Sequence, residues 1–113
     1  MGIPVDDMST NQISSDGIPP EDLARELDAL GPRWSTADGG LHLTVPGPMS
    51  LTGVAVAFIG TLADELEHYP RIVLERDAMT LSIRSDGAES VTIIDLVFAA
   101  RVEQWLRGNG WPT

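Results

Sequence analysis

Cysteine is absent from this chain of 113 residues, and positive charge is scarce. The lack of cysteine excludes disulfide bonds, thiolate metal sites and a thiol nucleophile. Seven basic residues face seventeen Asp and Glu, which gives a formal net charge of −10 at pH 7. Because an acidic surface repels phosphate backbones and anionic lipid headgroups, the composition argues against a nucleic-acid partner and against a membrane partner.

Signals for export, membrane insertion and cofactor binding are also missing. The first seven residues carry neither the basic region nor the apolar region of a signal peptide, and no later apolar run looks long enough to span a bilayer. No spacing of His and carboxylate residues matches a known metal site, and no Gly-rich phosphate loop is present. We therefore expect a soluble cytoplasmic protein with no metal and no cofactor.

The composition changes once along the chain. Residues 1–18 are rich in Ser, Asp, Gly and Pro and show no apolar period, so we predict a flexible N-terminal tail. The remaining residues, 19–113, are enough to bury one modest core and are predicted to form a single domain.

Three segments show the helical spacing of apolar residues. The first begins at residues 19–22, where prolines and acids suit a helix start, and ends at Gly31. The second runs from Ser50 to the neighbourhood of Pro70. Its predicted buried stripe consists of Leu51, Ala55, Phe58, Ile59, Leu62 and Leu66. The third contains Ile94, Val97, Val102, Trp105 and Leu106 and stops at Gly108.

Two hairpins are predicted between the helices. Residues 38–40, Asp-Gly-Gly, form a turn signal before the alternating residues Leu41, Leu43 and Val45. Residues 72–76 and the alternating face of Met79, Leu81 and Ile83 form the second hairpin, followed by a polar loop at 84–90. The order αββαββα predicts an α+β fold, with an antiparallel four-stranded sheet covered on one face by three helices.

The stretch from Asp64 to Asp95 resembles the active-site segment of the pterin-4a-carbinolamine dehydratases. That family has an acidic residue four positions before a His-His-Pro triplet, then a third His, a Gly-rich turn and an Asp at a helix start. Asp64, His68, Pro70 and Asp95 fall on the matching positions of this frame without a gap. Tyr69 and Asp86 stand where the family has its other two histidines. The family has the same order of elements, and as a pattern the resemblance extends over residues 19–108.

The resemblance implies a reaction and a set of site residues. The family removes water from a 4a-hydroxytetrahydropterin to give the quinonoid dihydropterin, which requires an acid for the C4a hydroxyl and a base for the N5 proton. Histidine serves either purpose, since it changes charge near neutral pH. The implied catalytic residues are His68, Asp86 and Asp95. The implied pterin-binding residues are Asp64, Tyr69, Pro70 and Ser85.

Each main candidate also has a structural interpretation. A histidine at a helix C-terminus interacts favourably with the helix dipole, which would explain His68. Asp86 and the following glycine are typical of a polar turn. Thr92 and Asp95 have the spacing of a capping box, in which a threonine and an acid satisfy the first amides of a helix.

Two classes of function therefore stay open. The first is an enzyme, a divergent dehydratase that is weakened by the loss of two histidines. The second is a noncatalytic protein on the same fold, such as a Rubisco assembly factor or a dimerisation partner, as the resemblance also implies. In both cases we expect a homodimer or homotetramer, because a short sheet has edges that need cover.

Overall fold

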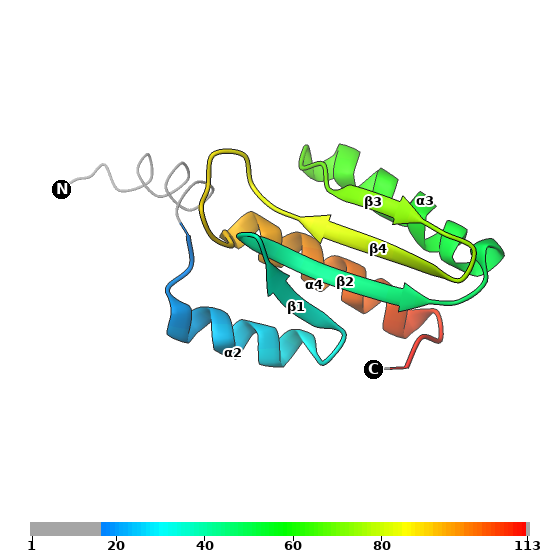
Figure 1. Cartoon of the computed structure of the whole chain (residues 1–113), viewed down its shortest axis with the longest axis horizontal. Helices are drawn as coiled ribbons and strands as arrows, with labels where there is room; N and C mark the ends of the chain where they lie inside the picture. Colours follow the sequence, from blue (N-terminus) through cyan, green and yellow to red (C-terminus); the bar gives the residue numbers. More distant parts are fainter. Residues whose placement is uncertain (1–16, 113) are drawn as a thin grey trace.

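The computed structural model describes residues 17–112 and confirms the predicted α+β fold (Figure 1). Its elements follow the predicted order of helix, hairpin, helix, hairpin, helix. They are α2 (Pro20–Leu30), β1 (Trp34–Ala37), β2 (Gly40–Pro46), α3 (Met49–Leu66), β3 (Arg71–Leu74), β4 (Ala78–Ile83) and α4 (Ile93–Gly108). Residues 1–16, which make up most of the predicted tail, lie outside the described part.

The four strands form one antiparallel sheet in the order β1-β2-β4-β3. One row of paired residues crosses the whole sheet through Trp34, Leu43, Leu81 and Ile72. Because side chains alternate along a strand, this row faces the helices, while the adjacent row faces the opposite side. Figure 1 shows the strands in front, with α3 and α4 behind them.

The core lies between the sheet and the helices. Six alternating strand side chains are at most 1% exposed: Leu41, Leu43, Val45, Met79, Leu81 and Ile83. Helical residues that are equally buried pack against them: Ile59, Leu62, Phe98, Val102 and Leu106. Full burial of one such side chain stabilises the fold by about 1.5–3 kcal/mol, so this interface fixes the positions of α3 and α4.

Helix α3 is rotated relative to the predicted stripe. Leu51, predicted to be buried, is 53% exposed, whereas Thr52 is fully buried. The buried positions 52, 55, 59 and 62 recur at three and four residues, which places Leu51 about one position off the core-facing line. The Thr52 hydroxyl compensates its burial by donating to the Pro48 carbonyl at 3.3 Å.

The second hairpin is also shorter than predicted. Strand β3 ends at Leu74, and Ala78, expected in the connection, is the first residue of β4. The amide of Glu75 donates to the Ala78 carbonyl at 2.9 Å, so residues 75–77 close the turn.

Gly17 and Ile18, which the prediction placed in the tail, are attached to the start of α4. Gly17 forms a bridge with Thr92, and the Ile18 amide donates to the Val91 carbonyl at 2.8 Å. A Cβ atom on Gly17 would lie 1.9 Å from the Ser90 hydroxyl oxygen. A side chain at position 17 would therefore require the Ser90 side chain to move.

Contrary to the expectation that no apolar run could span a bilayer, α3 is long and apolar enough to do so by composition. The helix packs against β3, β4 and α4, and it contributes Ala55, Ile59 and Leu62 to the core. This packing is typical of a helix in a globular domain.

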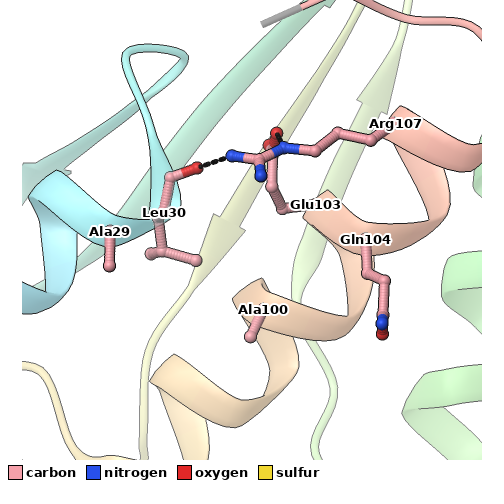
Figure 2. A pocket seen from close by; sticks show the side chains of 6 residues that line it. All are labelled: Ala29, Leu30, Ala100, Glu103, Gln104 and Arg107. Atoms are coloured by element: carbon pink, nitrogen blue, oxygen red, sulfur yellow. Dashed lines mark hydrogen bonds and ion pairs between the residues drawn. The ribbon is translucent and has the colours of Figure 1, made fainter.

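A buried carboxylate joins α4 to the segment between α2 and β1. The Glu103 side chain is 5% exposed; its Oε1 accepts from Arg33 Nε at 2.7 Å and from Trp34 Nε1 at 2.8 Å. Its Oε2 accepts from Arg107 Nε at 2.7 Å. Arg107 in turn donates to the Leu30 carbonyl at 2.9 Å, beside a shallow pocket of about 360 Å³ (Figure 2).

Burial raises the pKa of Glu103, but hydrogen bonds from Arg33, Arg107 and Trp34 outweigh it, so the pKa lies below its ordinary value. We expect Glu103→Gln to lower the free energy of unfolding by about 3 kcal/mol at neutral pH, because two arginines lose a buried anionic partner. Chemical denaturation measures this loss. The control, Asp22→Asn, breaks an exposed pair with Arg25 and should cost below about 1 kcal/mol.

The effect of Glu103→Gln on stability should also depend on pH. Because the folded-state pKa of Glu103 is depressed, its stabilisation is complete above the ordinary value of 4.5. The stabilisation is lost as the pH falls from there through the folded-state value. The difference in stability between wild type and Glu103→Gln should therefore shrink as the pH falls below 4.5. A constant difference would contradict this account.

Candidate functional site

The site is built around Asp95 in the first turn of α4. Thr92 precedes the helix with an extended backbone, and its side chain accepts from the Asp95 amide. The Thr92 amide donates to Asp95 Oδ2 at 3.0 Å, so the predicted capping box is present. The capping role leaves the other carboxylate oxygen, Oδ1, for different partners. Asp95 is completely buried.

Ser85 connects this carboxylate to the end of β4. The Ser85 hydroxyl donates to Asp95 Oδ1 at 3.0 Å, and its oxygen lies 2.7 Å from the Thr92 hydroxyl. Since a hydroxyl has one proton, the Thr92 hydroxyl is the donor to Ser85 in this arrangement. The chain of bonds therefore runs from Thr92 through Ser85 to Asp95.

His68 reaches the same oxygen from the end of α3. The helix ends with Glu67 in the left-handed conformation, at φ 51° and ψ 43°. The amides of Glu67 and His68 both donate to the Ala63 carbonyl, which fixes the turn. The turn places the imidazole edge-on to Phe98, with ring centroids 6.1 Å apart. His68 Nε2 lies 2.7 Å from Asp95 Oδ1, and the side chain is 14% exposed.

The Asp95 carboxylate is surrounded by hydrogen-bond donors. The helix dipole of α4 places positive potential at this end, and three groups can donate to the carboxylate. An ionised Asp95 assigns the proton of a neutral His68 to Nε2, which leaves Nδ1 as an acceptor. Such an imidazole can take a proton on Nδ1, and the resulting imidazolium is stabilised by the carboxylate.

The other predicted site residues lie differently. Pro70 is partly buried and directly precedes β3, while Asp64, Tyr69 and Asp86 are exposed. The pKa of the Tyr69 phenol is raised above 10, first by local desolvation and then by the neighbouring Asp64 carboxylate. Tyr69 is therefore a proton donor in hydrogen bonds at neutral pH and not a base.

The structure thus brings His68, Ser85 and Asp95 together. Asp86 follows Ser85 in the chain but takes part in no hydrogen bond or ion pair within residues 17–112. The linking role of Ser85 was not foreseen, although one signal was available. Position 85 continues the alternation of the buried residues Leu81 and Ile83, so its side chain points to the helix side.

Within residues 17–112, three shallow pockets share no residue with this network. Three shallow pockets on the described surface have volumes of about 300–360 Å³, and their linings include none of His68, Tyr69 or Asp86. Within residues 17–112, no group of three or more His, Asp or Glu is arranged to hold a metal ion.

No protein-family model matches the sequence, and no curated protein matches it. The structure is similar to a solved crystal structure described as a transcriptional coactivator/pterin dehydratase from Brucella melitensis. The TM-score is 0.71, with 16% sequence identity, over 78% of this chain and 96% of that chain. This chain has the pterin dehydratase fold. At 16% identity the likeness shows the fold alone, so the arrangement of His68, Ser85 and Asp95 is argued from its own geometry.

We predict that neutral His68 carries its proton on Nε2, because Asp95 accepts at that nitrogen. Nitrogen-15 NMR of the imidazole reports the tautomer directly. Asp95→Asn should shift the tautomer equilibrium, since an amide can also donate to the ring. Asp64→Asn, which removes an exposed acid four residues before His68, should leave the tautomer unchanged. A wild-type imidazole protonated on Nδ1 would contradict the assignment.

Proposed function

We propose that this protein binds a 4a-hydroxytetrahydropterin and dehydrates it slowly to the quinonoid dihydropterin. The observation that carries this proposal is the 2.7 Å contact between His68 Nε2 and Asp95 Oδ1 on a pterin dehydratase fold. It supports His68 as the proton-transfer group, oriented by a buried carboxylate.

The proposed chemistry follows from the order of the hydrogen bonds. His68 Nδ1 accepts the N5 proton of the substrate, and the imidazolium is stabilised by Asp95 through Nε2. The C4a–O bond then breaks, and the hydroxyl leaves as water after it receives a proton. The imidazolium or a bound water supplies that proton, so no oxidant or cofactor is consumed.

The remaining predicted residues have supporting roles in this proposal. Tyr69 and Asp64 bind the pterin as a hydrogen-bond donor and acceptor, and Pro70 and Ser85 shape the site. Asp86 stands where the family has a histidine and accepts a hydrogen bond but does not donate when ionised. Acid–base groups contribute about a hundredfold or more each, so the loss of two histidines implies a slow enzyme.

The dehydratase assay tests the proposal with paired variants. We expect a wild-type rate well below that of a three-histidine enzyme and a loss of about a hundredfold or more in His68→Ala. His68→Gln keeps a hydrogen-bond donor near Asp95 but cannot transfer a proton, so it should be equally slow.

Tyr69→His combined with Asp86→His should raise the rate if the site still accepts the pterin. The control, Glu26→Gln on the exposed face of α2, should leave the rate unchanged. No turnover in wild type, together with no gain in the double variant, would favour a noncatalytic function.

A noncatalytic interaction protein is the second candidate, and an exposed apolar surface on α3 favours it. Met49, Leu51 and Val54 are 46%, 53% and 55% exposed. Beside them lies a shallow pocket of about 300 Å³, which is lined by Leu51, Val54, Trp105, Asn109, Gly110 and Trp111. An apolar surface of this kind suits a protein partner. The word coactivator in the description of the similar structure is compatible with such a role.

The simplest such partner is a second copy of the chain. Within the described residues β1 and β3 are the edges of the sheet, and each pairs with one neighbour only. Unpaired edges and an apolar helix face are both relieved by self-association. A homodimer or homotetramer in the cytoplasm is therefore part of the proposal.

Light scattering at micromolar concentration should report a homodimer or larger assembly. Leu51→Glu should shift the distribution toward monomer, because it places a charge in the apolar surface of α3. The matched control is Ala24→Glu, which adds the same charge at an exposed position of α2. A monomeric wild type would contradict this prediction. An unchanged assembly in Leu51→Glu would indicate that the interface lies at the sheet edges instead.

A further inference from the structure

The face of the sheet that points away from the helices carries a row of polar side chains. The register places Ser35, His42, Ser82 and Arg71 side by side across β1, β2, β4 and β3. Within this row the Ser82 hydroxyl lies 3.3 Å from His42 Nδ1. Ser82 therefore has a histidine on one side and an arginine on the other.

Arg84 adds a second arginine beside the row. It follows buried Ile83 by one residue, so its side chain starts on the same face as Ser82. A Cβ atom on Gly40 would lie 2.8 Å from Arg84 Cβ and 2.3 Å from the Ile83 carbonyl oxygen. The lack of a side chain at Gly40 therefore leaves room for the Arg84 side chain on the face of the sheet that points away from the helices.

The two arginines differ from all the other basic residues of the chain. The seven basic residues are all arginines. Five of them form ion pairs: Arg25 with Asp22, Arg33 and Arg107 with Glu103, Arg76 with Asp77, and Arg101 with Glu65. Arg71 and Arg84 have no carboxylate partner within residues 17–112, although acidic residues outnumber basic residues in this part of the chain.

Within residues 17–112, this arrangement places two arginines without an ion-pair partner near one another. Arg71 pairs with Ser82, and Arg84 directly follows β4, two residues after Ser82, so the two arginines are diagonal neighbours about 7–8 Å apart on one face. Like charges at such a spacing repel each other, and an anion between them relieves the repulsion. We call Ser82, His42, Arg71 and Arg84 the Ser82 patch.

We propose that the Ser82 patch binds the phosphate group of a small ligand. Guanidinium groups donate two parallel hydrogen bonds to phosphate oxygens, and here two arginines lie on the same face of the sheet as the Ser82 hydroxyl. When Ser82 donates to His42 Nδ1, the neutral imidazole has its proton on Nε2 and offers a further donor. A phosphate dianion, with several acceptor oxygens, matches this set of donors better than a carboxylate does.

The charge of the whole chain limits the size of the ligand. A net charge of −10 opposes a long polyanion, which would extend over acidic surface on either side of the patch. A single phosphate group responds mainly to charges within the Debye length, about 8 Å at physiological ionic strength. The patch is therefore suited to a small phosphate ester and not to nucleic acid.

The Ser82 patch is separate from the site that contains His68. Arg84 directly precedes Ser85, but the two side chains point to opposite faces of the sheet because neighbours along a strand alternate. Phosphate binding does not depend on the proposed dehydratase activity. The two can be tested independently.

Titration with inorganic phosphate, followed by amide NMR at constant ionic strength, tests the proposal. Saturable shifts are expected at residues 42, 71 and 82–84. Arg71→Gln combined with Arg84→Gln should weaken binding about tenfold or more, because charge-assisted hydrogen bonds are lost. The matched control is Arg25→Gln with Arg76→Gln, which removes the same charge from exposed pairs and should bind as wild type does.

Two further ligands define the chemical class. Glycerol phosphate should give the same shifts as inorganic phosphate, whereas acetate should bind at least tenfold more weakly. The proposal is overturned by non-saturable shifts, by equal weakening in the control variant, or by acetate binding as tightly as phosphate. The amide spectra themselves show whether each variant is folded.

Discussion

The fold around the site depends on how one buried carboxylate is satisfied. An ionised carboxylate without partners in a protein interior costs several kcal/mol, so Asp95 requires donors for both of its oxygens. The donors come from three segments: the Thr92 amide before α4, the Ser85 hydroxyl after β4 and the His68 ring after α3. The carboxylate therefore sets how these segments meet. Capping and proton transfer are not competing explanations of Asp95, since one oxygen serves the helix and the other faces the histidine.

Helix α4 carries a second buried carboxylate, and the comparison separates structure from chemistry. Glu103 lies eight residues after Asp95, about 12 Å along the helix. Its partners include two arginines, which keep their charge across the whole working range of pH, and their positions hold the segment before β1. Asp95 is paired instead with an imidazole, a hydroxyl and a backbone amide, none of which carries a permanent charge. The proton transfer that we propose therefore belongs to one end of α4, and the attachment of the segment before β1 belongs to the other.

The sequence predicts correctly the features that depend on residues close together in the chain. The hairpins and the order of elements depend on neighbours two to four residues apart, and Leu41, Leu43 and Val45 alternate as expected. The stripe of α3 was misplaced at Leu51, because Thr52 is polar by composition and buried only through its bond to Pro48. Glu103 gave no local signal, since Arg33 and Trp34 lie about seventy residues away in the chain. Likewise His68 and Asp95 could each be selected from the family frame, but only the fold shows their contact.

In the proposed reaction, the residues at positions 69 and 86 decide which proton transfers are possible. Tyr69 has a raised pKa and can only donate a hydrogen bond at neutral pH, and Asp86, when ionised, can only accept. Histidine is the residue type suited to both taking and returning a proton, so the proposal assigns both steps to His68. If the same imidazole must do both, removal of the N5 proton has to precede departure of the hydroxyl. In the proposed reaction, the imidazolium formed in the first step is then the acid that protonates the leaving hydroxyl.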